Sequence, residues 1–494
     1  MKSAPFRVLS SLRAFSIALL IVLTSLQFAN AQYAPAVALP QTLQPGADTI
    51  TAEQAKDFLE VLASPAFEGR GTGQIGYMKA AHWVAGKLAE FGLEPAGNND
   101  TYFQMMPIIR RSPDMNECKI VGPAGLEIAG QGNLGFERYT NEAEVTGEVV
   151  FVCLQGAEPQ LPADVSLRDK IVIYTSDEAA FARAPRLLTR ARPAATLRIV
   201  DTKPVSVAQT IFPGRKQRSA RVSGTILVAA ANQLAAAFQV PANWNTRPNV
   251  QLTGQQISIR MQMREEQAGA PNVVALLKGS DPELVDEYIV IGAHLDHLGI
   301  RNGTINPGAD DNGSGSVAVL SIARAMAENP VKPKRSVLFM WFAAEEVGLL
   351  GSKYYTEHPI FPLDKMTCML NIDMVGRNED NGEGDAAADN EGHIHLVGSQ
   401  KGDNALHEII LNANRHVGFQ FELDMESVWN RSDQVNFFNQ GVPVAFMFGG
   451  FHPDYHQPSD KVEAINFKKI AAAAKLYYLS AYGAAAHGKF EANP

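Results

Sequence analysis

Short apolar runs alternate with amphipathic stretches of helical length between residues 288 and 448. The apolar runs cover 288–292, 336–342, 367–373 and 442–448, and the helical patterns cover 315–327, 348–355 and 404–416. Alternation of this kind predicts an α/β fold, in which helices pack on both faces of a largely parallel sheet. We therefore expect a three-layer α/β sandwich whose ligand site lies at the carboxyl ends of the strands.

A segment of different texture interrupts the N-terminal part of the chain. Residues 147–152 and 170–174 have the pattern of buried strands, and Ile257, Ile259, Met261 and Met263 alternate as in a returning strand. Because 494 residues exceed what one hydrophobic core normally holds, we expect two domains. Residues 141–264 are predicted to form a smaller, inserted, β-rich α/β domain. The larger domain would then be discontinuous and comprise residues 49–140 and 265–485.

The N-terminus has the pattern of a signal peptide. Basic residues extend to Arg13, an apolar run covers 14–26, and Ala29-Asn30-Ala31 is a small-x-small cleavage signal. We expect cleavage after residue 31 and export to the periplasm or the medium. An uncleaved membrane anchor is the weaker alternative, because the apolar run is shorter than the roughly 20 residues that span a bilayer.

The formal charge of −9 argues against nucleic acid and anionic membrane surfaces as partners. The three cysteines, Cys118, Cys153 and Cys368, are widely spaced, which excludes a disulfide framework and a thiolate zinc site. At most one disulfide can form. Cys368 lies in an apolar run, where we expect a buried, inert thiol.

Polar residues follow several of the predicted strands directly. His294 and Asp296 come after the first strand, Glu345 and Glu346 after the second, and Asp373 ends the third. Asp310 and Asp311 precede a Gly-rich turn that opens a helix, and Tyr455 and His456 lie in a later polar loop. Since parallel strands bring their carboxyl ends to one edge of the sheet, these side chains are predicted to meet there.

Each of these clusters taken alone is also typical of an ordinary structural feature. Acidic residues commonly precede a helix, where they complement its dipole, and a single histidine in a loop is usually just exposed. Five clusters in succession favour a shared metal site. Imidazole and carboxylate ligands without thiolates suit catalytic zinc, because open positions remain for water and substrate.

As they stand here, these motifs resemble the co-catalytic di-zinc exopeptidases, which include secreted bacterial leucine aminopeptidases and plasma glutamate carboxypeptidase. The resemblance covers about 49–130 and 265–485, and the segment 67–73, Phe-Glu-Gly-Arg-Gly-Thr-Gly, also resembles an early Gly-Arg segment of that family. The inserted segment resembles, more weakly, a protease-associated domain.

The resemblance implies two Zn²⁺ ions per chain. One ion takes His294 and Asp373, the other takes Glu346 and His456, and Asp311 bridges them. Glu345 matches the general base, Asp296 matches a residue that orients a zinc ligand, and Tyr455 and Arg431 match residues that contact the substrate. One departure is visible at Ser432-Asp433-Gln434, where the family often has Ser-Asp-His. That histidine does not bind the metal in the family.

The implied activity is release of N-terminal residues from peptides, with Glu345 accepting a proton from water. A carboxypeptidase or dipeptidase on the same scaffold is the first alternative, with Arg431 or a cation of the inserted domain holding the substrate carboxylate. A one-zinc cyclase of N-terminal glutamine and a non-catalytic receptor-like protein are weaker, because all ligands and the base are present. His297, His393, His395 and His452 match no position and are predicted to be surface residues or to support the site from outside. The sequence leaves the oligomeric state open.

Overall fold

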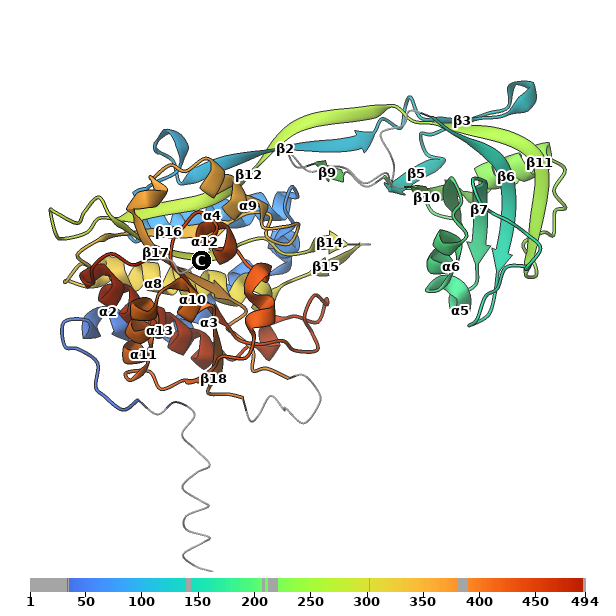
Figure 1. Ribbon diagram of the computed structural model, residues 1–494. Coiled ribbons are helices and arrows are strands. Elements are labelled where there is room, and N and C mark those ends of the chain that lie inside the picture. Colours follow the sequence, from blue (N-terminus) through green and yellow to red (C-terminus); the bar gives the residue numbers. More distant parts are fainter. Residues whose placement is uncertain are drawn as a thin grey trace, which may run out of the picture. The chain divides into compact units, whose positions relative to one another are not determined.

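Figure 1 shows the computed structural model of the chain, which describes residues 33, 35–138, 144–206, 209–211, 221–301, 303–380 and 390–491. The segment 1–31, where a signal peptide is expected, lies outside the described residues, so that expectation stays a prediction. None of the helices within the described ranges is long and apolar enough to cross a membrane.

The chain divides into two compact units. Unit 1 comprises Met1–Met106 and Ala270–Pro494, and unit 2 comprises Pro107–Gly269. The expected start of the inserted domain at residue 141 is therefore too late. The physical reason is strand pairing, since β3 (Lys119–Val121) and β5 (Leu134–Arg138) are part of the unit 2 sheet, where they pair with β11 and β10.

Unit 1 is built on a mixed sheet in the order β19-β18-β20-β17-β13-β16-β12-β2. The bounds are β19 (Gln420–Glu422), β18 (His393–Val397), β20 (Val444–Phe448), β17 (Met366–Asp373), β13 (Tyr288–His294), β16 (Ser336–Phe342), β12 (Met263–Leu277) and β2 (Phe103–Pro113). Strands β20, β17, β13 and β16 are parallel, whereas β12 and β18 run antiparallel to their neighbours β16 and β20. The parallel group is thus the centre of the sheet.

Helices cover both faces of this sheet (Figure 1). One group comprises α2 (Gln44–Thr49), α3 (Ala52–Leu62), α8 (Gly315–Glu328), α11 (Asn404–Asn414) and α13 (Phe467–Ala486), and another comprises α9 (Leu350–Glu357) and α12 (Gln434–Phe438). Trp341 donates to the main-chain oxygen of Ser316 in α8, while the neighbouring Phe342 packs on Phe437 of α12. Because adjacent residues of a strand point to opposite faces, the two groups lie on opposite sides. Helix α4 (Ile75–Glu90) follows the turn that holds Arg70.

Unit 2 contains a separate sheet in the order β4-β3-β11-β6-β7-β8-β10-β5. Further bounds are β4 (Glu127–Ala129), β11 (Asn249–Arg260), β6 (Glu144–Leu154), β7 (Ile171–Ser176), β8 (Ala195–Val200) and β10 (Val222–Leu227), with helices α5 (Glu178–Phe181), α6 (Ala184–Arg190) and α7 (Val228–Ala237). Strands β6, β7, β8 and β10 are parallel. This unit has its own hydrophobic core, which includes Phe136, Phe151 and Trp244.

All three cysteines are buried free thiols. Cys368 is fully buried in β17, as expected from its apolar surroundings. Burial raises the pKa of the Cys368 thiol to about 12, so this side chain stays protonated and inert at neutral pH.

Candidate metal centre

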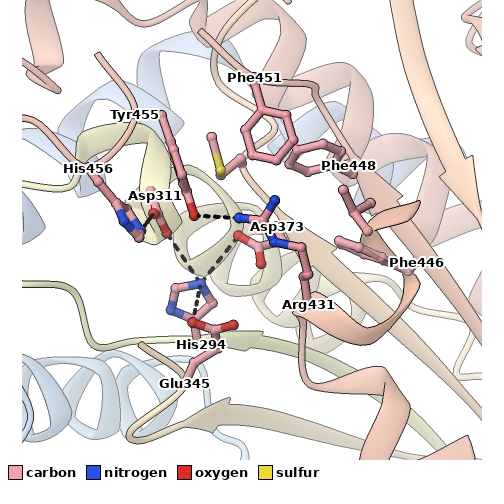
Figure 2. Close-up of a pocket in the computed structure, with 12 residues that line it drawn as sticks. His294, Asp311, Glu345, Asp373, Arg431, Phe446, Phe448, Phe451, Tyr455 and His456 are labelled. Carbon is pink, nitrogen blue, oxygen red and sulfur yellow. Dashed lines mark hydrogen bonds and ion pairs between the residues drawn. The ribbon is translucent and has the colours of Figure 1, made fainter. Parts of the chain in front are cut away.

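The carboxyl ends of the central strands of unit 1 surround one pocket (Figure 2). Strand β13 ends at His294 and β17 ends at Asp373, while Glu345 follows shortly after the end of β16. The charged and polar residues that line the pocket are His294, Asp311, Glu345, Asp373, Arg431, Tyr455 and His456. Seven residues expected to form the site thus share a single cavity. Two further expected residues contact members of this group: Glu346 contacts His456, and Asp296 contacts Glu345.

The first cluster of ligand-type atoms gathers around His294. Its Nε2 lies 3.3 Å from Oδ1 of Asp373, 3.4 Å from Oδ1 of Asp311 and 3.9 Å from Oε2 of Glu345. Ligand atoms of His294, Glu345 and Asp373 all lie within 4.8 Å of one another. An imidazole nitrogen that faces three carboxylates is the arrangement expected around a cation.

The second cluster gathers around Glu346. Nε2 of His456 lies 3.2 Å from Oε2 of Glu346 and 3.0 Å from Oδ2 of Asp311. Nδ1 of His297 lies 2.7 Å from the other oxygen of Glu346. Asp311 therefore turns one oxygen toward His294 and the other toward His456, which is the geometry of a carboxylate that bridges two cations (Figure 2).

The carboxylates of this pocket are buried close together, and their ionised forms are therefore stabilised by a nearby positive charge. Burial and the neighbouring carboxylate of Asp373 raise the pKa of Glu345 well above its usual value, although His294 opposes the shift. Burial likewise raises the pKa of Asp373. Several buried carboxylates in contact repel one another, and ionising them all without a cation is costly.

The pKa values of the two histidines are raised as well, but by their carboxylate neighbours and against the effect of burial. Burial alone would lower the pKa of His294, but Asp373 and Glu345 outweigh it and raise that pKa well above 6.5. Hydrogen bonds to Asp311 and Glu346 outweigh burial at His456 and raise its pKa to about 9. The nitrogen and oxygen donor set without sulfur fits zinc in a catalytic site.

The structure differs from expectation in how Asp296 supports the site. Nδ1 of His294 lies 3.0 Å from the main-chain oxygen of Asp296, whereas the carboxylate oxygen is 3.9 Å away. The carboxylate instead accepts from the main-chain N–H of Glu345 at 3.0 Å and from the hydroxyl of Thr72 at 2.8 Å. Asp296 therefore fixes the His294 ring through its backbone and the Glu345 turn through its side chain.

Ser432 and Gln434, at the place of the Ser432-Asp433-Gln434 departure, both hydrogen-bond to the strand that carries Asp373. The Ser432 hydroxyl donates to Oδ2 of Asp373 at 2.8 Å, and Nδ2 of Asn371 donates to both Ser432 and Gln434. Gln434 in turn donates to the main-chain oxygen of Trp429. The glutamine therefore anchors the strand that carries Asp373, without contacting the candidate ligands.

Arg70 is fully buried and connects the two loops that carry His294 and Asp311. Its guanidinium donates to four main-chain oxygens, those of Leu62, Leu295, Pro307 and Gly308, at 2.7–3.1 Å. The Gly-Arg segment noted in the sequence thus positions the ligand-bearing loops, and Arg70 itself lies outside the pocket.

Three non-glycine residues with left-handed backbone conformation lie at the pocket. Ala344, Met374 and His456 all adopt positive φ, between 52° and 58°, and each lies beside or at a candidate ligand. Non-glycine residues rarely adopt this conformation, and such strain clusters at functional sites.

Two histidines that sequence reasoning left unassigned belong to the surroundings of the centre. His297 is fully buried against Glu346, and His452 is buried with Nε2 3.2 Å from Oδ2 of Asp310. Their signal in the sequence was proximity, since His297 follows Asp296 and His452 precedes the Tyr455-His456 pair. Both are buried, so the supporting position, one of the two expected for them, is the one observed.

The outer wall of the pocket combines one cation with aromatic rings (Figure 2). Arg431 donates to the hydroxyl of Tyr455 at 3.0 Å and lies over the ring of Phe451, 4.9 Å from its centroid. Phe446 and Phe448 complete an apolar lining beside the charged clusters. The pocket therefore combines an apolar wall with the charged clusters.

Residues 272–480 match the sequence profile of Peptidase family M28. This part of the chain is similar to that family. The M28 segment, as we call residues 272–480, contains every candidate ligand described above. It also contains Glu345, Tyr455 and Arg431, while unit 2 lies outside it.

Two curated proteins are similar to this chain. The chain is 33% identical over 180 residues to leupeptin-inactivating enzyme 1 of Streptomyces exfoliatus, covering 36% of each chain. It is 28% identical over 309 residues to a probable leucine aminopeptidase of Arthroderma benhamiae, covering 57% of this chain and 80% of the relative. The match thus spans about a third of the length of the first of these relatives.

A solved structure shares the fold. The zinc aminopeptidase of Bacillus subtilis aligns with a TM-score of 0.50 and 19% identity, covering 88% of this chain and 95% of that chain. At this identity the likeness concerns the mixed α/β fold alone. The alignment extends beyond the M28 segment.

Proposed function

We propose that the protein is an exported zinc aminopeptidase that releases N-terminal residues from peptides at a centre of two zinc ions. The observation that carries the proposal is Asp311, whose two carboxylate oxygens face His294 on one side and His456 on the other. His294 and Asp373 would hold one ion, and Glu346 and His456 would hold the other. The names of the relatives support the aminopeptidase class.

When bound, the two ions would supply a polarised substrate carbonyl and a water of lowered pKa. Glu345 lines the pocket beside His294 without being needed as a bridging ligand. Its carboxylate accepts the proton of the attacking water and passes it to the leaving amine. The raised pKa of Glu345 in the buried pocket suits a group that must first accept and then donate a proton.

The remaining side chains orient the substrate. The Tyr455 hydroxyl, held by Arg431, donates to the oxygen that becomes negative as the carbonyl is attacked. Carboxylates at the pocket attract the free α-amino group of a peptide, and the apolar wall takes its first side chain. A free amine as the anchoring group restricts cleavage to the N-terminal residue.

The contacts of Arg431 bear on the choice between the aminopeptidase and the carboxypeptidase alternatives. In a carboxypeptidase this guanidinium would bind the terminal carboxylate of the substrate. Here it donates to Tyr455 and lies over Phe451, so its planar face and one of its donors are engaged. This arrangement favours a role in positioning Tyr455.

The finer expectations from the sequence form part of the same proposal. They are the three-layer sandwich typical of zinc exopeptidases, the export signal at 1–31 and a protease-associated character of unit 2. Deleting unit 2, joined through β2 and β12, and comparing short with long peptides would test whether it restricts access. Unchanged relative rates would remove that role.

The activity is tested with matched peptides that are free, N-acetylated or C-amidated, before and after removal of metal by a chelator. We expect acetylation and chelation each to abolish cleavage, zinc to restore it, and amidation to have little effect. Cleavage blocked by amidation instead would identify a carboxypeptidase. Zinc binding without turnover of any peptide would contradict a peptidase function.

A further inference from the structure

A third group of metal-type residues lies in unit 1 apart from the candidate centre. Glu379, His395 and Glu422 place ligand atoms within 4.8 Å of one another. His395 belongs to β18 and Glu422 to the neighbouring parallel strand β19, where the two residues are paired in register. Glu379 comes from the segment after β17. None of these three residues is among the ligands expected for the candidate centre or in a motif noted in the sequence.

The group is centred on a buried imidazole. His395 is 2% exposed, and its Nε2 lies 2.9 Å from Oε2 of Glu379 and 3.4 Å from Oε2 of Glu422. The other oxygen of Glu422 lies 2.6 Å from Nδ1 of His393. One ring nitrogen and two carboxylate oxygens therefore converge on a common point, as they do around His294.

The opposite nitrogen of the ring faces a further carboxylate but makes no hydrogen bond within the described part of the chain. Nδ1 of His395 lies 3.2 Å from Oδ1 of Asp424, whose side chain is largely exposed. A carboxylate near the far nitrogen of a metal-binding histidine raises the basicity of the ring. Three carboxylates around one buried imidazole leave excess negative charge, which a divalent cation offsets.

We propose that Glu379, His395 and Glu422 bind a third divalent cation of the zinc class, distinct from the two of the candidate centre. The mixed nitrogen and oxygen donors favour zinc over calcium or magnesium, which prefer oxygen alone. Three protein ligands leave the fourth position of a tetrahedral ion to water.

This site would stabilise one wall of the pocket. The Glu379 side chain lies against Gly450, since a Cβ at that glycine would come within 2.5 Å of it. Gly450 precedes Phe451, and the ring of His395 is centred 6.0 Å from that of Phe448. Both phenylalanines line the pocket. The cation would therefore fix the aromatic wall, with the chemistry left to the centre itself.

The alternative is a metal-free ion pair. A protonated His395 between its carboxylates would offset part of their negative charge. The buried ammonium of Lys469 also interacts electrostatically with Glu379 and Glu422. Under this alternative the group would bind no zinc.

The experiment counts zinc. The full-length protein is stripped of metal, equilibrated with ZnCl₂ alone, separated from free ions and analysed by elemental mass spectrometry. We expect three zinc ions per wild-type chain and two per chain of His395→Gln. Glu379→Gln, which changes a partly exposed side chain, serves as the second variant and should also lose one ion. His407→Gln is the matched control, because His407 is a buried histidine bonded to Ser399 rather than to carboxylates.

The outcomes are separable from those of the catalytic proposal. Two zinc ions in the wild type, with no change in His395→Gln and Glu379→Gln, would overturn the third site and leave the candidate centre untouched. A third ion that persists in His294→Gln and disappears in Glu379→Gln would support the third site even if no peptide is cleaved.

Discussion

Both units contain a group of four parallel strands, but the residues at the carboxyl ends of these strands differ between the units. In unit 1 the central strands lead into His294, Glu345 and Asp373, whereas in unit 2 strands β6, β7, β8 and β10 end at Leu154, Ser176, Val200 and Leu227. Within the described part of the chain, all three metal-type groups fall in unit 1. Parallel strand ends thus provide a platform, and the residues placed on them provide the chemistry.

The sharpest test of this contrast removes one carboxylate from each unit. Glu345→Gln should lower the rate of peptide cleavage by about 10²–10⁴-fold while zinc content stays unchanged, because the proton acceptor is lost and the ligands remain. Glu148→Gln, which changes a strand residue of unit 2 paired with Lys170, is the control and should leave the rate unaffected. Loss of zinc in Glu345→Gln would instead make this residue a ligand.

The second-largest effect is expected from Arg70, which holds the loops that carry His294 and Asp311. Arg70→Met leaves four main-chain oxygens without their donor, at about 1–3 kcal/mol for each buried group. We expect the free energy of unfolding to fall by at least about 3 kcal/mol, measured by denaturant titration of the zinc-loaded protein. A loss below about 1 kcal/mol would show that Arg70 is dispensable for the loops.

The next prediction concerns His297, which contacts the candidate ligand Glu346. Its Nδ1 lies 2.7 Å from Glu346, so His297→Gln should weaken zinc binding by about 10–100-fold, as loss of such partners typically does. Competition with a chromogenic chelator measures the affinity, with His407→Gln as control. Unchanged affinity would place His297 in packing alone.

The smallest effect is expected in unit 2. Lys170→Met removes an ion pair with Glu148, in which both side chains are about a quarter exposed. Pairs of this kind contribute about 0–1 kcal/mol, so thermal unfolding and peptide cleavage should hardly change. A large loss of cleavage would mean that unit 2 acts on the chemistry, and the contrast between the units would fail.

The sequence predicted much of unit 1 because two kinds of pattern coincide there. Apolar runs located the strands, and polar residues directly after them located the pocket, which gathers His294, Asp311, Glu345, Asp373 and His456. The helix expected at 315–327 is observed as α8 at Gly315–Glu328. The end of such a strand can be located in the sequence because the apolar run stops where the charged side chains begin.

Other features depend on contacts between distant residues and have no local signal. The start of unit 2 was misplaced because the short strands β3 and β5 are recognisable only through their partners. The carboxylate of Asp296 points to Glu345 rather than to His294, and His395 finds Glu379 and Glu422 only once β18 and β19 are paired. Long-range pairing, and not residue type, decides these cases.

The central claim is that Asp311 joins two zinc ions at the strand ends of unit 1. Anomalous diffraction from a zinc-soaked crystal, measured on both sides of the zinc absorption edge, tests it directly. We predict one peak bound by His294 and Asp373, another bound by Glu346 and His456, and one Asp311 oxygen about 2.0–2.2 Å from each. A single peak among these residues, or an Asp311 that contacts only one ion, would contradict it.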